Sequence, residues 1–270
     1  NPSSPHPISQ PLNAHYIRSI SFLKNTPFLF VGSEHHGLHI FNISNPHSPK
    51  HIAHLLNASA CYHISFSNNS ALAFLGTNHG LHVLDISQPL SPHPIGYALN
   101  SSFVHSISLS KDNSFAFVGT DHGFHVLNIS DPASPQPIGH ALGTNRVWAI
   151  RLTQDQTLAF VGTWHHGLHI LNISDPTSPQ PIGHALGSNS VWALRLNQDE
   201  TLAFVGTANH GLQILNISDP ASPQPIGQAL GSSEVNAIRL NQDQTLAFVG
   251  TDHHGLQILN ISDPASPQPI

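Results

Sequence analysis

The chain is a tandem repeat, and this feature limits its possible folds more than any other. The phrase Asp-Pro-Ala-Ser-Pro-Gln-Pro-Ile starts at Asp131, Asp219 and Asp263, and a variant with one changed residue starts at Asp175. Looser copies start at Asn1, Asn45 and Gln88, so successive copies lie 43 or 44 residues apart. Repeats of this length are typical of modular folds in which each repeat is one supersecondary unit. A chain of near-identical units has few places for a single catalytic constellation.

We expect one repeat domain over residues 1–270. Its units are 1–44, 45–87, 88–130, 131–174, 175–218 and 219–262, followed by a duplicated terminal strand segment, 263–270. The end segments Asn1–Ile8 and Asp263–Ile270 are copies of each other, and the last unit needs only one of them. Either the sequence is cut at a repeat boundary, or the spare copy pairs with a neighbouring molecule, which would build a head-to-tail filament.

Each unit predicts four short β-strands. In the unit around 176–219 the apolar runs are 180–186, 191–196, 201–207 and 212–217, and turns containing Gly, Asn, Asp or Pro separate them. Such runs are too short for amphipathic helices, and their turn residues favour strands. Apolar residues lie on both faces of each run, as expected for a sheet covered on both sides. Four strands per 44 residues predict an all-β, six-bladed β-propeller of four-stranded blades, and a β-solenoid is the alternative.

The sequence resembles the LVIVD-repeat β-propellers. The resemblance lies in Gly-Leu-x-Ile-x-Asx-Ile-Ser-Asp-Pro, present at 167–176 and 255–264, and in the preceding Leu-Ala-Phe-Val-Gly at 158–162. It extends over the whole chain. The resemblance implies a propeller, often in a secreted or cell-surface setting, and implies no single activity because propellers have many functions.

Composition excludes several classes of function. Charged residues make up only 8% of the chain, and the eight Lys and Arg against a net charge of −6 exclude a nucleic-acid grip. A single cysteine, Cys61, excludes an intrachain disulfide, and no apolar run is long enough to insert into a membrane. The chain has no Met and begins at Asn1, so we expect a removed leader or a longer parent sequence.

Histidine is unusually abundant, at 23 residues. One His precedes Gly in every unit, and these six are the candidate metal ligands: His36, His79, His122, His166, His210 and His254. The structural interpretation is favoured, because a tight hairpin needs the positive φ that Gly provides. No firm metal site or cofactor is predicted. Protonation of all His would add 23 positive charges to a net charge of −6, so stability or association should weaken near pH 5.

Eight Asn-x-Ser sequons are candidate N-glycosylation sites. They are Asn42, Asn57, Asn68, Asn100, Asn128, Asn172, Asn216 and Asn260. Five of them belong to a repeated Asn-Ile-Ser, where Asp85 holds the sixth position. The alternative is that Asn ends a strand and makes a local turn. Asp before Pro in each linker is likewise expected to start a turn.

Trp148 and Trp192 occupy one equivalent position and are expected to pack between blades, whereas Trp164 in a turn is a better contact candidate. No catalytic motif is present, and we predict no catalytic residue and no enzyme. The sequence favours a secreted or cell-surface scaffold, adhesion module or filament subunit, whose partners are proteins, above all copies of itself, and covalent glycans. The alternative is a ligand- or metal-binding propeller that uses the His-Gly turns.

Overall fold

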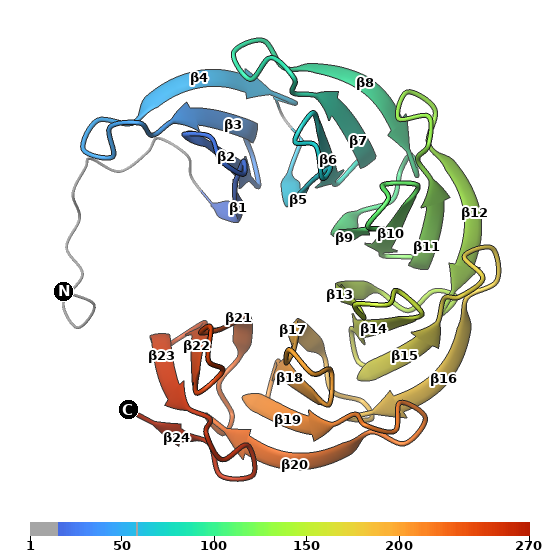
Figure 1. Cartoon of the computed structure of the whole chain (residues 1–270), viewed down its shortest axis with the longest axis vertical. Helices are drawn as coiled ribbons and strands as arrows, with labels where there is room; N and C mark the ends of the chain where they lie inside the picture. Colours follow the sequence, from blue (N-terminus) through green and yellow to red (C-terminus); the bar gives the residue numbers. More distant parts are fainter. Residues whose placement is uncertain (1–15, 58) are drawn as a thin grey trace. The chain divides into compact units, whose positions relative to one another are not determined.

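The computed structural model describes residues 16–57 and 59–270. These residues form six four-stranded antiparallel sheets, each with its strands in chain order, and no helix (Figure 1). The sheets are the blades of a six-bladed β-propeller, which confirms the predicted fold class. By its internal contacts the chain divides into two compact units, one reaching to Ala116 and including Leu127–Pro137, the other made of Phe117–Val126 and Ile138–Ile270. The boundary runs through the third blade.

The strands are short, and most have six residues. The first three blades contain β1 Ile17–Phe22, β2 Phe28–Ser33, β3 Gly37–Asn42, β4 Lys50–Leu55; β5 Cys61–Phe66, β6 Leu72–Thr77, β7 Gly80–Asp85, β8 His93–Ala98; and β9 Val104–Leu109, β10 Phe115–Thr120, β11 Gly123–Asn128, β12 Gln136–Ala141. The last three contain β13 Val147–Leu152, β14 Leu158–Thr163, β15 Leu168–Asn172, β16 Gln180–Ala185; β17 Val191–Leu196, β18 Leu202–Thr207, β19 Leu212–Asn216, β20 Gln224–Ala229; and β21 Val235–Leu240, β22 Leu246–Thr251, β23 Gly255–Asn260, β24 Gln268–Pro269. The four runs expected between 180 and 217 match β16 to β19 closely.

Each blade takes its fourth strand from the next repeat of the sequence. The strand β16 lies beyond the Asp175-Pro linker, yet it pairs with β15 and completes the fourth blade. The last blade follows the same rule, because Gln268 and Pro269 pair with Asn260 and Leu259. The terminal segment Asp263–Ile270 therefore supplies β24, while the duplicate Asn1–Ile8 lies outside the described residues.

The core lies between neighbouring blades and consists mainly of the second and third strands, together with residues of the first strands. One cluster joins the fourth and fifth blades and includes Phe160, Ile170, Val191 and Leu215, which are buried almost completely. This explains why apolar residues occur on both faces of the strands in the inner blades, since a neighbouring blade covers each side. In the first and sixth blades Ile20, Phe22 and Leu256 stay more than half exposed. The only cysteine, Cys61, lies in the core between the first two blades, and burial raises the pKa of its thiol to about 12.

Glycines allow the blades to approach closely. A Cβ atom on Gly162 of the second strand would lie 2.5 Å from Cγ1 of Val191 in the next blade. A Cβ atom on Gly183 of the fourth strand would lie 1.9 Å from the backbone oxygen of Pro220 in the next linker. The Asp-Pro linkers thus pack on the fourth strand of the preceding blade, where Gly leaves room for them. The first blade has Ala53 at this position.

Candidate functional site

The six His-Gly turns connect the second and third strands of the blades. The Gly after His has a positive φ in all six, from 63° at Gly211 and Gly255 to 112° at Gly80, which confirms the structural role predicted for this Gly. A Thr side chain closes each turn from the second to the sixth blade; for example, Thr207 Oγ1 donates to the oxygen of Gly211 at 2.9 Å and accepts from the backbone of His210. Each turn is therefore held by its own backbone and one hydroxyl.

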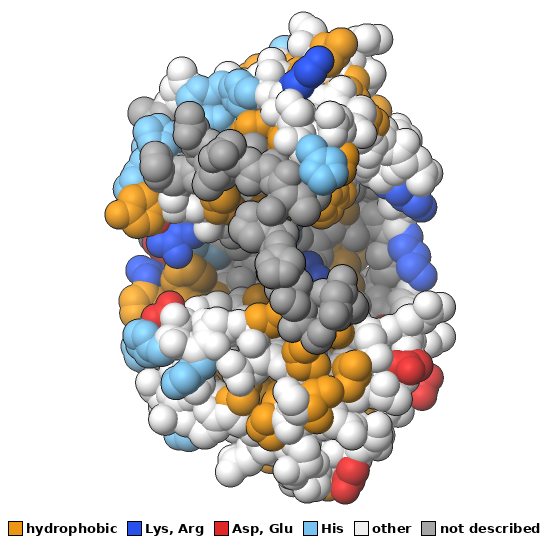
Figure 2. Space-filling view, turned by 90° about the vertical axis from the view of Figure 1, so that its left-hand side faces the viewer, with side chains coloured by type: hydrophobic (Ala, Val, Ile, Leu, Met, Phe, Trp, Pro, Cys, Tyr) orange, Lys and Arg blue, Asp and Glu red, His pale blue; other side chains and the backbone are white. Residues whose placement is uncertain are grey.

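The six candidate His side chains of these turns are all exposed: His36, His79, His122, His166, His210 and His254. In the part of the chain that the structure describes, no three His, Cys, Asp or Glu side chains are placed to share a metal ion. The face in Figure 2 shows His side chains in several separate groups, and Lys, Arg, Asp and Glu in small scattered patches. The turns are thus separate features of separate blades, and metal binding by them stays a prediction.

The second His of the motif is the more unusual group, because it faces a fourth strand. We call His39, His82, His125 and His169 the inner histidines. In three blades the partner across the strand pair is also His, and the ring centroids lie 4.2 Å apart in His39–His54, 4.6 Å in His125–His140 and 4.7 Å in His169–His184. In the second blade the partner is Tyr97.

The partner His stabilises the turn. Nε2 of His140 donates to the backbone oxygen of His122 at 2.9 Å, and Nε2 of His184 donates to that of His166 at 2.9 Å. His54 makes the same contact with His36. The last two blades replace the inner His by Gln, and Gln257 Nε2 donates to the oxygen of His254 at 2.7 Å. A side-chain donor to the backbone oxygen of the turn is thus common to the His and Gln versions.

The inner histidines are held neutral. Burial, and then the neighbouring His140, lower the pKa of His125 to about 4, and a hydrogen bond with the backbone of His122 opposes this only in part. Burial and then His184 lower the pKa of His169 to about 4 in the same way. Nε2 of His125 is buried with no hydrogen-bond partner among the described residues, so a proton there would have no acceptor. Folding therefore opposes protonation of these rings.

The repeated Asn of Asn-Ile-Ser ends the third strand and makes a local turn. In all five copies Asn Oδ1 accepts from the backbone N–H of the Ser two residues later, at 2.8 to 3.0 Å. Asp85 does the same at the sixth position. Asn57, Asn68 and Asn100, outside this motif, are exposed, as are Asn128, Asn172, Asn216 and Asn260, whereas Asn42 is half-buried. The turn explains the preference for Asn or Asp there, and it leaves Nδ2 available for a glycan.

Glycan occupancy should differ among these sites. We expect glycopeptide mass spectrometry, after expression in a host with N-glycosylation, to find Asn172 and Asn216 modified and Asn68 unmodified. The reason is that Nδ2 of Asn68 donates to the backbone oxygen of Lys111, where a sugar would collide. Ser174→Ala is the control, because it removes the sequon at Asn172 and keeps the backbone N–H that bonds Asn172. A modified Asn68 beside unmodified Asn172 and Asn216 would contradict this expectation.

The Asp residues before Pro also make turns, as predicted. Oδ1 of Asp131 accepts from the backbone of Ala133 at 3.1 Å, and its backbone oxygen accepts from Ser134 at 3.1 Å. Asp175, Asp219 and Asp263 repeat the first of these bonds. Each carboxylate is thus engaged within its own linker.

Three positions in each blade vary in side chain although their surroundings repeat. The first precedes the first strand and holds Tyr16, Ala60, Phe103, Arg146, Ser190 and Glu234. The second is the second residue of that strand: Arg18, Tyr62, His105, Trp148, Trp192 and Asn236. The third opens the His-Gly turn: Glu34, Asn78, Asp121, Trp164, Ala208 and Asp252. We call these positions the variable rim.

All three rim positions lie at the same end of their blade. The start of β13 pairs with the end of β14, since Val147 lies opposite Thr163. Next to this pair, the backbone N–H of Trp164 donates to the oxygen of Arg146 at 2.9 Å. The same bond joins Glu34 to Tyr16, Asn78 to Ala60, Ala208 to Ser190 and Asp252 to Glu234. Because the bond is between backbone groups, the blade forms whichever side chain is present.

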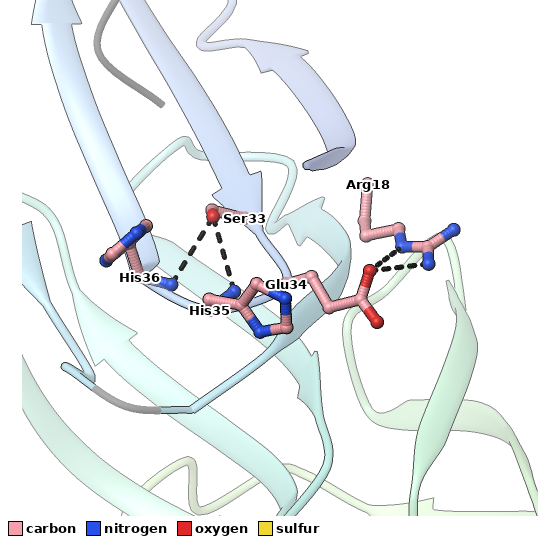
Figure 3. Close-up of polar contacts among 5 residues, drawn as sticks. All are labelled: Arg18, Ser33, Glu34, His35 and His36. Atoms are coloured by element: carbon pink, nitrogen blue, oxygen red, sulfur yellow. Dashed lines mark hydrogen bonds and ion pairs between the residues drawn. The ribbon is translucent and has the colours of Figure 1, made fainter. Parts of the chain in front are cut away.

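In the first unit the rim holds an ion pair and an aromatic group. Arg18 donates through Nη2 to Oε2 of Glu34 at 2.5 Å, beside the turn in which Ser33 accepts from the backbones of His35 and His36 (Figure 3). In the neighbouring blades, the Tyr62 ring lies 6.1 Å from Phe103 and 5.5 Å from His105.

In the second unit the rim is a tryptophan cluster. Trp148 and Trp192, from adjacent blades, meet edge to face at 4.7 Å, and Trp164 lies 6.3 Å from each. The packing expected of Trp148 and Trp192 is therefore observed. The Arg146 guanidinium lies 4.2 Å above the Trp164 ring and forms an ion pair with Asp121 at 2.7 Å. A cation over an indole and an aromatic T-shaped pair are both attractive contacts, so these half-buried side chains are ordered before any partner arrives.

Sequence reasoning found the tryptophans of the rim but not the rim itself. The available signal was the difference between repeats. The repeats 176–219 and 220–263 differ at nine positions, and five of these are rim positions or their neighbours: 189/233, 190/234, 192/236, 208/252 and 209/253. Only the strand pairing shows that these scattered positions lie together.

Comparisons with solved structures confirm the architecture. The periplasmic gluconolactonase PpgL of Pseudomonas aeruginosa superposes with a TM-score of 0.75 at 14% identity, covering 89% of this chain and 80% of that one. The β-propeller domain of Cps50 (Swd1) from Myceliophteria thermophila superposes with a TM-score of 0.71 at 12% identity, covering 90% and 82%. At such identities the likeness extends to the fold alone. No curated protein sequence matches the chain.

The repeat itself identifies the family. The LVIVD repeat matches six times, at residues 26–54, 67–97, 104–141, 157–185, 199–229 and 246–269. Each match includes the second, third and fourth strands of one blade or most of them, with the His-Gly turn inside it. The described residues contain no helix that is long and apolar enough to cross a membrane. The chain belongs to the LVIVD-repeat family.

Proposed function

We propose that this protein is a non-enzymatic, exported scaffold or adhesion module that binds a protein partner through its variable rim. The observation that supports the proposal most strongly is that the side chains of the rim differ from blade to blade, while the strands and backbone hydrogen bonds around them stay the same. Packing would impose the same side chain at equivalent positions with the same surroundings, as it does for the Phe and Gly of the second strands. The variation at the rim supports this proposal, because the fold does not select these side chains.

The composition of the rim supports a protein partner. Trp, Tyr and Arg are the residue types that dominate the binding energy of protein interfaces. The tryptophan cluster brings three Trp side chains together with Arg146, and Asp121 balances the charge of Arg146. Half-buried, pre-ordered side chains lose little entropy on binding, which favours affinity. Two further parts of the proposal, self-association through Asn1–Ile8 and glycosylation, stay predictions.

An adhesion assay tests this function. Beads coated with the protein should adhere to cells that produce it, and the double rim variant Trp164→Ala/Trp192→Asn should reduce adhesion at least tenfold, since each hot-spot residue contributes about 2 kcal/mol or more. The new residues are those of the neighbouring blades, Ala208 and Asn236, so the frame accepts them. Gln242→Ala is the control, because Gln242 is exposed in the turn between β21 and β22, at the opposite end of its blade. Equal adhesion by wild type and the double rim variant would refute the proposal.

A further inference from the structure

The first blade differs from the other five on its fourth strand. His51 in β4 pairs with Phe41, a register position at which the other blades have Pro94, Pro137, Pro181, Pro225 and Pro269. His51 is therefore a local exception to the repeat. Proline cannot donate a backbone hydrogen bond and is tolerated at a sheet edge, so the strand itself does not require His.

His51 approaches the inner histidine of its blade. Nε2 of His51 lies 3.2 Å from Nδ1 of His39, which is only 8% exposed. The His54 ring stacks on His39 at 4.2 Å, with 11° between the planes, and its Nε2 is occupied by the backbone oxygen of His36. His39 is thus held between two rings, one of which presents a nitrogen to it. The pairs His125–His140 and His169–His184 have no third His of this kind, because Pro137 and Pro181 occupy its place.

The two nitrogens lie within hydrogen-bond distance of each other, and this separation is also close to the distance between two ligands of one metal ion. Two imidazole nitrogens bound at about 2.1 Å to one tetrahedral ion lie about 3.4 Å apart. Neutral imidazole is a ligand that suits Zn²⁺, Ni²⁺ and Cu²⁺. His39 is fixed by its stacking on His54, while the exposed His51 can turn slightly to direct its lone pair at the ion.

We propose that His39 and His51 together bind one divalent transition-metal ion of the Zn²⁺, Ni²⁺ or Cu²⁺ class, with water completing its coordination. The site lies on the strand pair β3–β4 and is distinct from the six His-Gly turns. It is independent of the variable rim, so neither proposal depends on the other.

Calorimetric titration with ZnCl₂ and NiCl₂ tests the site. Wild type should bind one equivalent of metal ion at this site. His51→Pro should bind this equivalent at least tenfold more weakly. Proline is the residue of the other five blades, so the metal-free melting temperature should stay the same. His51→Gln is the second variant, since it removes the ligand and keeps the backbone N–H. His140→Gln is the matched control, because it changes a pair of neighbouring His rings that lacks a third His, and it should bind as wild type does.

Each outcome is decisive. Loss of one equivalent in both His51 variants, with His140→Gln unchanged, supports the site. Unchanged binding in both His51 variants overturns it, since the metal then binds at other histidines. Loss in His51→Pro with full binding in His51→Gln also overturns it, because the effect then comes from proline in the strand and not from the missing imidazole.

Discussion

Lowering the pH from 7.5 to 5 should lower the melting temperature by about 10 °C. The unfolded chain protonates its histidines near pH 6.5, whereas His39, His125 and His169 resist protonation in the folded protein until the pH reaches about 4. Between these pH values the unfolded state binds more protons, so protons favour unfolding. The stability is complete above about pH 6.5 and is lost progressively as the pH falls toward 4. Allowing for partial solvent screening, we expect the three rings together to account for about 3 kcal/mol.

The chain provides the matched variant for this experiment. Gln213 replaces the inner His in the fifth blade, and its Nε2 donates to the oxygen of His210 at 2.5 Å, so Gln fits the position without a titrating group. Replacing His39, His82, His125 and His169 by Gln should reduce the fall in melting temperature to less than half. Calorimetry of both proteins at the two pH values checks this. An equal fall in both would assign the pH dependence to general charge repulsion among the other histidines.

Gly206→Val should destabilise the protein by about 3 kcal/mol and lower the melting temperature by about 10 °C. A Cβ atom on Gly206 would lie 2.5 Å from the backbone oxygen and 2.6 Å from Cγ1 of Val235, in the first strand of the next blade. A backbone oxygen cannot turn away as a flexible side chain can, so the blades must separate. Valine favours strands, so the cost cannot come from local preference.

Gly187→Asn is the control for this substitution. Gly187 has a φ of +50°, and nothing lies within 4 Å of the position of its Cβ. Asn57 and Asn100 occupy the equivalent position of the sequence in the first two blades, although without the positive φ of Gly187. Asn adopts a positive φ more readily than most residues. We expect a cost below about 1 kcal/mol. A similar loss in both variants would mean that backbone freedom, and not close approach of the blades, explains the glycines of this protein.

The sequence was sufficient to predict the strands and the turns because both depend on local pattern. The runs at 191–196 and 201–207 became β17 and β18 within one residue, and the Gly after His has the positive φ that a hairpin needs. Register inside a blade also follows from the repeat, since identical units must pair identically. The Asn and Asp side chains of the linkers make the local turns that their type favours.

Contacts between strands of different repeats could not be predicted in this way. His169 pairs with His184 only because β16, which lies beyond the linker, joins β15. The two residues are therefore neighbours in space although they belong to different repeats of the sequence. The role of Gly183 appears only when Pro220 of the next blade is placed against it. The variable rim was hidden for the same reason, since Arg146 and Trp164 meet through a backbone bond across a hairpin.

The central claim is that the strands of the blades hold the fold and that the variable rim binds a partner. Thermal unfolding of the double rim variant Trp164→Ala/Trp192→Asn, measured together with its adhesion, tests this claim most directly. The close pair Trp148–Trp192 at 4.7 Å, the two looser contacts of Trp164 at 6.3 Å and one cation–π contact are lost. All of these side chains are only half-buried, so the melting temperature should fall by less than about 5 °C while adhesion falls at least tenfold. A fall as large as that of Gly206→Val, with adhesion of the folded protein intact, would show that the tryptophans serve the fold and would contradict the account.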